Sequence, residues 1–346
     1  MNRWRSEQIK VGDLFEGMEL FFEKGWTDGL PIVPPTPHKV EEMLSSLSLT
    51  GQEVIGSIPE RNLQITAEKA AINAVMAGCL PAHFPVVIAG LEAVLDPRFG
   101  VHGPTASTGG ASLLLIVSGP IVSQLGFNTG HNLLGPGHRT NLVIGRAVQL
   151  ALINAGGTKE FDQTTLGHPG KIGFCLAERE QEEWETLNVE QGFRKEESTV
   201  TVIATEGPNQ IYQPAAKTPE VLLRTIADRM VSAGTFNIQR NTPCVVVIGD
   251  EHWQLLVQEK WSKQEVKDYL FEHAKRPKTD LLDFGFSSDY LAGIDGEWVR
   301  AVPSPEALYL IAGGGKGGPF SAFIPGWGSL NQSQPVTKLI THSGFV

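Results

Sequence analysis

A cysteine followed four residues later by a histidine is the first feature of this sequence that could do chemistry. Cys79 and His83 stand where one predicted helix ends and the next begins. The pKa of a thiol is lowered near a helix N-terminus and an imidazole, which raises the thiolate fraction at neutral pH. We therefore expect Cys79 to be a nucleophile or redox thiol with His83 as its base. The alternative is a small apolar residue packed beneath an Ala-rich helix, the interpretation we favour for Cys175 and Cys244.

A Gly-rich loop at residues 126–137 opens onto a predicted helix that begins at Arg139. Its backbone amides, the helix N-terminus and Arg139 favour an anionic ligand, and Asn132 would contact that ligand. His131 and His138 are candidate acid–base groups or, with a carboxylate from elsewhere, metal ligands. The loop matches neither the Walker pattern nor G-x-G-x-x-G, so no cofactor is indicated.

A stiff Pro-rich segment at residues 25–36 carries Thr27 and Asp28. Prolines hold the backbone extended, and Gly29 permits a sharp turn. Such a loop could present Asp28 and Thr27 to a ligand, with Asp28 orienting a proton carrier. The alternative is a rigid connector in which Asp28 caps the turn, because Asp-Gly is a common turn dipeptide.

Three shorter Gly-rich blocks adjoin predicted strands. Residues 102–110 and 167–171 each precede a strand, and Lys171 in the second block is a candidate anion ligand. Loops at strand ends are where α/β folds assemble sites, so these blocks are expected to complete a pocket. Residues 313–318 follow a strand and resemble a phosphate cradle, but Pro319 stands where a helix would begin, which favours a flexible turn with a solvated lysine.

The remaining sequence supplies the elements that would position these loops. Short, nearly continuously apolar runs predict buried strands at residues 112–117, 172–177, 199–204, 244–248 and 307–312. Capping residues and apolar periodicity predict helices at residues 37–49, 67–77, 81–95, 139–154, 219–232 and 263–273. This alternation predicts an α/β protein with mixed or mostly parallel sheets, flanking helices and Gly-rich loops at the strand ends.

Composition limits the class of protein. The chain has 346 residues, 41% of them hydrophobic and 19% charged, as in a folded protein with a sizeable core. A net charge of −10 without any Lys/Arg run argues against a nucleic-acid surface. The sequence lacks a signal peptide pattern and the roughly 18 consecutive apolar residues of a membrane span. Three widely separated cysteines argue against a disulfide framework. We expect a cytoplasmic protein without a nucleic-acid or membrane partner.

A polar, Pro-containing stretch at residues 207–218 suggests a division into two domains. Residues 1–210 would form an N-terminal α/β domain that carries Cys79 and the 126–137 loop, and residues 211–346 a smaller C-terminal α/β domain. No internal repeat is visible in the sequence. Gly-rich α/β enzymes of this size are often homodimers.

Five segments of the chain are distinctive: GWTDGLPIVPPT, AINAVMAGCLPAHFPVV, LGPGHRTNLVIGRAVQLALINAGG, GHPGKIGFCLAE and SAFIPGW. Together they resemble a poorly characterised bacterial family whose members occur alone or fused to UGSC-type (seleno)protein domains. The chain contains no U/C-G-S-C stretch, so it resembles the partner region of that redox domain. The resemblance implies thiol or selenol redox chemistry and a UGSC-type redox protein as partner. It also implies a set of site positions, which are Asp28, Cys79, His131, Asn132, Arg139 and Lys171.

Three functions follow from these observations. The first is an enzyme that acts on a small anionic molecule by thiol-dependent redox or thiol-transfer chemistry, an oxidoreductase or transferase. Cys79 would be its nucleophile, His83 or His131 its base, and Arg139 with the 126–137 loop its anion site. The second is a hydrolase or lyase in which His131 and His138 act as acid and base or bind a metal. The third is a non-catalytic subunit that docks a separate Cys/Sec redox protein.

Overall fold

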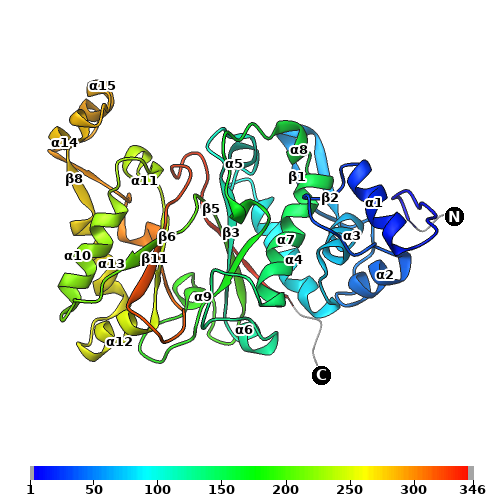
Figure 1. Cartoon of the computed structure of the whole chain (residues 1–346), viewed down its shortest axis with the longest axis horizontal. Helices are drawn as coiled ribbons and strands as arrows, with labels where there is room; N and C mark the ends of the chain where they lie inside the picture. The colour runs from blue at the N-terminus through cyan, green and yellow to red at the C-terminus, as the bar shows by residue number, and fades with distance from the viewer. Residues whose placement is uncertain (1–3, 342–346) are drawn as a thin grey trace.

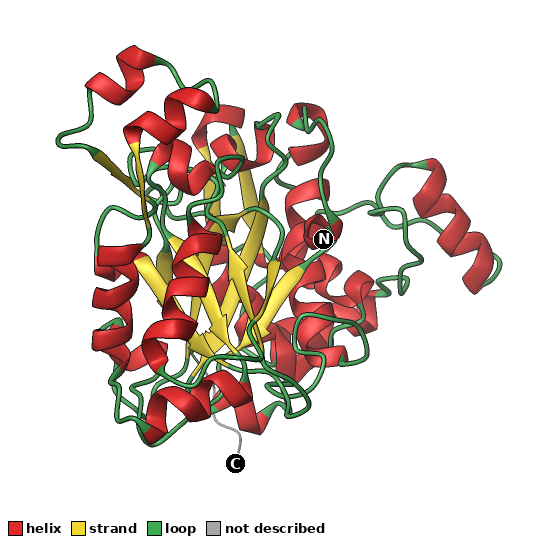
Figure 2. Ribbon diagram, turned by 60° about the vertical axis from the view of Figure 1, so that its left-hand side comes forward, coloured by secondary structure: helices red, strands yellow, loops and turns green. Residues whose placement is uncertain are grey.

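Two four-stranded sheets lie face to face at the centre of the molecule (Figure 1). The computed structural model describes residues 4–341; residues 1–3 and 342–346, the outer ends of the two predicted domains, lie outside the described residues. Helices cover the outer face of each sheet, so the layers run helix, sheet, sheet, helix (Figure 2). The expected α/β class with mixed sheets and flanking helices is confirmed.

The first sheet has the strand order β12-β5-β3-β4. Its strands are β3 (Ser112–Ser118), β4 (Phe174–Ala177), β5 (Thr199–Thr205) and β12 (Val336–Leu339). Strand β3 is parallel to β4 and antiparallel to β5, which in turn is antiparallel to β12. Successive side chains of a strand point to opposite faces. Leu113 and Leu115 therefore pack under the helices, while Leu114 and Ile116 face the second sheet. Burial on both faces explains the continuous apolar runs.

Helices of the N-terminal half cover the first sheet. They are α3 (Ala67–Ala77), α4 (Phe84–Val94) and α7 (Arg139–Asn154). Helix α7 lies so close to β4 that a Cβ at Gly145 would come within 2.8 Å of the Phe174 backbone nitrogen. A side chain at this position would separate helix from sheet, so glycine is required for the contact rather than for helix formation.

The second sheet has the strand order β10-β7-β11-β6. Its strands are β6 (Asn209–Tyr212), β7 (Cys244–Ile248), β10 (Leu308–Ala312) and β11 (Phe320–Ile324). Helices α10 (Pro219–Met230), α12 (Asp250–Gln258) and α13 (Lys263–His273) accompany it. Val245 and Val247 face the first sheet, and their neighbours Cys244, Val246 and Ile248 pack under the helices.

The two sheets share one topology, although no repeat is visible in the sequence. In each sheet two parallel strands, β3 and β4 or β7 and β10, are joined through a helix, α7 or α13, and an antiparallel strand follows, β5 or β11. Each sheet takes its fourth strand from the chain that leaves the other sheet, because β6 follows β5 and β12 follows β11. The boundary predicted at residue 210 falls within β6, and β12 lies in the sheet of the N-terminal half.

Helix ends largely follow the capping signals of the sequence. Thr66 accepts a hydrogen bond from the Lys69 amide at the start of α3, and Gly78 ends this helix with φ +88°. Ser262 forms the predicted capping box at the start of α13. Helix α2 (Pro37–Ser45) is shorter than predicted, because the chain turns after it, with Ser48 in the left-handed region.

The remaining elements are short or peripheral. The helices are α1 (Leu14–Glu23), α5 (His102–Ala106), α6 (Ile121–Gln124), α8 (Thr158–Phe161), α9 (Leu187–Glu190), α11 (Phe236–Arg240), α14 (Lys278–Asp283) and α15 (Ser288–Ala292). The remaining strands form two antiparallel pairs, β1 (Val54–Ile58) with β2 (Leu63–Thr66) and β8 (Lys275–Pro277) with β9 (Trp298–Arg300). Helices α14 and α15 project from the body at the upper left of Figure 1. Among residues 4–341, no helix has both the length and the apolarity needed to cross a membrane.

Candidate functional site

The chain segments that follow the four parallel strands β3, β4, β7 and β10 meet at the end of the two sheets where these strands finish. The amide of Arg179, after β4, donates to Ala312 O of β10 at 2.9 Å. The amide of Gly314, after β10, donates at 2.9 Å to Thr129 O in the 126–137 loop, which follows β3 and the short helix α6. The carboxyl ends of parallel strands are where α/β folds place ligands. We call this meeting point the loop junction and define it as residues 126–137, 178–179, 249–250 and 313–318.

His131 joins the two Gly-rich loops of the junction. Its Nε2 lies 2.6 Å from Lys316 O. A carbonyl only accepts, so Nε2 carries the proton and Nδ1 is the ring's remaining acceptor. The ring lies directly against Gly315, where a Cβ would be 2.3 Å from the imidazole Cγ. The 313–318 loop, expected to be a flexible turn, is therefore packed against the 126–137 loop.

Arg179 lies beneath these loops with part of its guanidinium unpaired. Nη1 donates to Gly314 O at 3.0 Å and lies 2.9 Å from Asp250 Oδ1. Nε and Nη2 are buried and have no hydrogen-bond partner among residues 4–341. These two nitrogens form the edge of the guanidinium that binds a carboxylate or phosphate through two parallel hydrogen bonds.

The backbone beside Arg179 is fixed by a buried carboxylate. Glu178 is 4% exposed; its Oε2 accepts from Ser118 Oγ at 2.7 Å and from the Leu187 amide at 2.6 Å. Its Oε1 lies 3.2 Å from Lys263 Nζ on α13. Glu178 thus ties the end of β4 to both halves of the molecule and limits the positions that the Arg179 side chain can take.

The 126–137 loop is held in shape by side-chain amides. Asn141 on α7 accepts from the Asn128 amide at 2.8 Å and donates to Asn128 O at 3.0 Å. Asn132, predicted to bind substrate, has φ +58° and donates from Nδ2 to Pro136 O at 2.7 Å, so this amide nitrogen stabilises its own loop. His138 is the exposed N-cap residue of α7.

Asp28 and Thr27 hold the Pro-rich segment in place at a distance from the junction. Arg146 on α7 binds both Asp28 oxygens, from Nε at 2.7 Å and from Nη2 at 2.9 Å. Asp28 Oδ1 also accepts from the Leu30 amide, and Thr27 Oγ1 donates to Leu30 O at 2.6 Å. These contacts match the rigid-connector alternative. They also show how the Nε/Nη2 edge of an arginine in this protein is used when a carboxylate is near.

The Arg139 guanidinium is hydrogen-bonded to the C-terminal end of α3. Its Nη2 and Nε donate to Gly78 O at 2.7 and 3.1 Å. The guanidinium therefore satisfies a helix C-terminal carbonyl, which a cation favours. The expected use of Arg139 as an anion ligand competes with this contact.

The expected lowering of the Cys79 pKa is wrong. Cys79 is 7% exposed, and burial raises the pKa of its thiol to about 12, although nearby Arg139 opposes this shift. Its Sγ lies 3.5 Å from Val143 O on α7. Cys79 follows the C-terminal cap of α3 and precedes a 3₁₀ turn at Pro81–His83, so the next α-helix, α4, begins only at Phe84.

His83, the other member of the predicted pair, is also enclosed. It is 4% exposed, and its Nδ1 accepts from the Leu80 amide at 3.2 Å. Burial and the Arg139 charge lower its imidazole pKa to about 4. In the described residues, no hydrogen bond joins His83 to Cys79. The other two cysteines are buried free thiols, and burial raises the pKa of both.

Lys171 lies at the end of the first sheet where β4 begins, opposite to the end that carries the loop junction. Its Nζ pairs with Asp162 at 2.9 Å. The two predicted blocks near it do meet, since the Thr165 amide donates to Thr108 O at 3.0 Å. Trp327 adjoins them through a 3.0 Å hydrogen bond from Nε1 to Ser107 Oγ. The structure therefore does not bring Lys171 together with His131.

Arg179 and Asp250 are the residues of the junction that sequence reasoning missed. Each stands within two residues of the end of a predicted strand, at residues 172–177 and 244–248. Their position just after buried strands is the signal that could have identified them. What the sequence does not show is that the two strand ends, about 70 residues apart, lie side by side.

Among residues 4–341, no group of three or more His, Cys, Asp or Glu side chains is placed to hold a metal ion. Comparison with protein-family models finds no match for the sequence, and comparison with curated proteins finds none either.

Proposed function

We propose that the protein is an enzyme that binds a small molecule bearing a carboxylate or phosphate at the loop junction. The observation that carries this proposal is the unpaired Nε/Nη2 edge of Arg179. Buried guanidinium N–H groups are normally paired, and an unpaired one costs free energy that a bound ligand recovers. Arg146 uses the same edge to bind the Asp28 carboxylate.

The Gly-rich loop above Arg179 supports the same ligand class. The amides of Gly315, Lys316, Gly317 and Gly318 donate no hydrogen bond to any residue in the range 4–341. Successive free amides in a glycine-rich turn form a concave anion-binding surface. The exposed Lys316 side chain adds a positive charge to this loop.

His131 would act as the general base. Its Nε2 is used by Lys316 O, so Nδ1 would take a proton from water or from a carbon next to the ligand's anionic group. This chemistry belongs to a hydrolase or a lyase. The burial of Cys79 and its raised pKa favour this acid–base mechanism over one in which the thiol is the nucleophile.

Binding of simple anions tests the ligand class. Calorimetric titrations with malonate, citrate and inorganic phosphate should show one site per chain. Arg179→Lys keeps the charge but removes the two-point contact, so binding should weaken at least ten-fold. Arg194→Gln alters a 71% exposed arginine and should change nothing. Equal affinity in wild type and Arg179→Lys would contradict the proposal.

The role of His131 requires a turnover assay, with hydrolysis and elimination substrates chosen among esters, amides and hydroxy acids that carry the preferred anionic group. For a substrate found in this way, His131→Gln, whose amide can still donate to Lys316 O, should lower kcat by about 10² or more and weaken binding of the simple anion far less than Arg179→Lys does. An unchanged kcat would remove His131 from the mechanism while leaving the anion site intact.

A further inference from the structure

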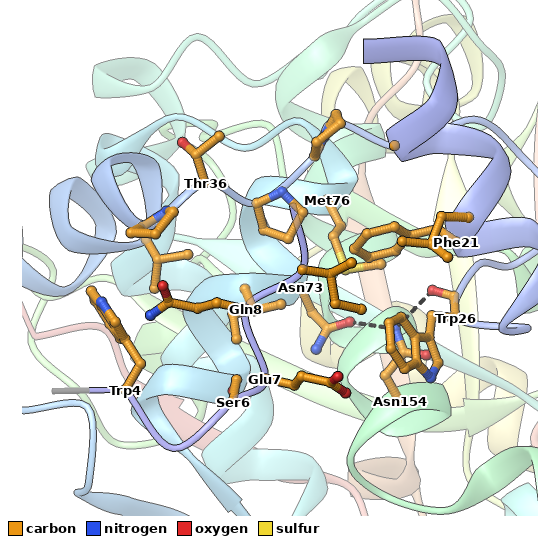
Figure 3. Close-up of a pocket in the computed structure, with 18 of the residues that line it drawn as sticks. Trp4, Ser6, Glu7, Gln8, Phe21, Trp26, Thr36, Asn73, Met76 and Asn154 are labelled. Carbon is orange, nitrogen blue, oxygen red and sulfur yellow. Dashed lines mark hydrogen bonds between the residues drawn. The ribbon is translucent and has the colours of Figure 1, made fainter. Parts of the chain in front are cut away.

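A cavity of about 710 Å³ lies on the side of α3 that faces residues 4–11, the N-terminal segment, and no residue of the loop junction lines it. Residues 4–11, α1, the Pro-rich segment and α3 surround it (Figure 3). This volume is within the range of sites for small organic ligands. Nothing in the proposed function uses this cavity.

Most of the cavity wall is aromatic or aliphatic. Phe21 and Trp26 meet edge to face, with ring centroids 5.5 Å apart and planes at 77°. Ile72 and Met76, one turn apart on α3, contribute aliphatic surface, and Trp4 lines the opposite end. Figure 3 shows Phe21 and Trp26 on one side of the cavity and Trp4 on the other. A flat apolar molecule would cover these surfaces and release the water in contact with them.

One end of the cavity carries an oriented pair of polar groups. Asn154 donates from Nδ2 to Trp26 O at 3.1 Å and to Asn73 Oδ1 at 2.7 Å, which fixes its amide (Figure 3). Both Nδ2 hydrogens are thereby used, and Asn154 Oδ1 accepts no hydrogen bond from residues 4–341. The indole N–H of Trp26 likewise donates to none of these residues. Asn154 Oδ1 and the Trp26 indole N–H are therefore an unused acceptor and an unused donor on two residues that line the cavity, the two kinds of group that a ligand hydroxyl needs.

The charged groups near the cavity do not favour a charged ligand. Glu68, 2% exposed, accepts from the Ser6 amide at 2.7 Å and from the Arg5 amide at 3.2 Å, which fastens the N-terminal segment over the cavity. Glu7 and Lys10 on this segment and Lys69 on α3 also line the cavity, so its two acidic and two basic lining residues cancel in formal charge. A lining without net charge does not compensate a buried ligand ion for its lost hydration.

From these contacts we infer that the cavity is a binding site for an uncharged aromatic molecule that carries one hydroxyl group. The ring system would lie between Phe21, Met76 and Trp4. The hydroxyl would donate to Asn154 Oδ1 and accept from the Trp26 indole N–H. This site is separate from the anion site at the loop junction, and its occupation would tie the N-terminal segment more firmly to α3.

The test uses 1-naphthol, with 1-naphthoate as the charged ligand of similar shape. Binding is followed by quenching of tryptophan fluorescence and by calorimetry on the full chain. Naphthol should bind with one site per chain, and naphthoate at least ten-fold more weakly at this site. No saturable naphthol binding, or equal affinity for the two compounds, would overturn the inference.

Variants locate the binding. Ile72→Trp fills the cavity from α3 and should weaken naphthol binding at least ten-fold. Gln8→Trp fills it from the exposed N-terminal segment, where it cannot disturb the core, and should have the same effect. Val221→Trp adds an indole to the 46% exposed outer face of α10 and should change nothing. Unchanged affinity in both cavity variants, or an equal loss in the control, would refute the assignment.

Discussion

Cys79 should resist alkylation in the native protein by a factor that can be worked out from its surroundings. With a pKa of about 12, about one Cys79 thiol in 10⁴ is ionised at pH 8. An exposed thiol with a pKa of about 8.5 is about one-quarter ionised at this pH. The thiolate populations therefore differ by about 2 × 10³, and the 7% exposure of Cys79 slows the reagent further.

The assay is timed labelling with iodoacetamide, followed by mass spectrometry of the cysteine peptides. Leu166→Cys introduces a reference thiol at a 94% exposed position of the same chain. Between pH 7 and 10 the Cys79 rate should rise about ten-fold per pH unit, whereas the reference should level off above about pH 8.5. A Cys79 labelling rate within ten-fold of the reference rate at pH 8 would refute the reasoning and would favour a mechanism in which the Cys79 thiol reacts.

Three further changes test the packing and the charges of the N-terminal half. Gly145→Ala should lower the free energy of unfolding in urea, even though alanine is the better helix former, because its Cβ meets the backbone of β4. Asp28→Asn should cost about 3 kcal/mol in the same assay, because it leaves Arg146 largely buried without its charge partner. His83 has a pKa of about 4 when folded and about 6.5 when unfolded, so the unfolded chain binds more protons between these values. Stability should therefore fall as pH drops from about 6.5 to 4, and less steeply in His83→Gln.

Matched controls make these outcomes decisive. Gly17→Ala in α1 places its Cβ at ordinary contact distances, 3.4 Å and beyond, so it should stabilise the protein by up to about 1 kcal/mol. Lys39→Gln breaks an exposed ion pair on α2 and should leave stability nearly unchanged. A stabilised Gly145→Ala, a neutral Asp28→Asn, or equal pH slopes with and without His83 would each contradict its prediction.

The sequence by itself determined most of the secondary structure of the sheets and their helices. The strand Cys244–Ile248 and the helices Arg139–Asn154 and Lys263–His273 have the predicted bounds. These elements are set by local signals, namely continuous apolar runs, a capping box and apolar periodicity. Strands β6, β11 and β12 were not predicted. Strands β6 and β12 are four-residue edge strands with mixed polarity, and each pairs with a partner more than 100 residues away. Strand β11 is a five-residue central strand that follows the Gly-rich 313–318 loop.

Tertiary structure decided which candidate residues share a site. Cys79 had the neighbours in sequence that suggest an activated thiol, but the packing of α3 against α7 buries it and reverses the direction of its pKa shift. Lys171 and His131 both belong to Gly-rich blocks, yet they lie at opposite ends of the first sheet. Arg179 lies in the loop junction only because the end of β4 contacts the end of β10, through the hydrogen bond from the Arg179 amide to Ala312 O. Desolvation and proximity arise from contacts between distant parts of the chain, so local sequence patterns could nominate these residues but could not group them.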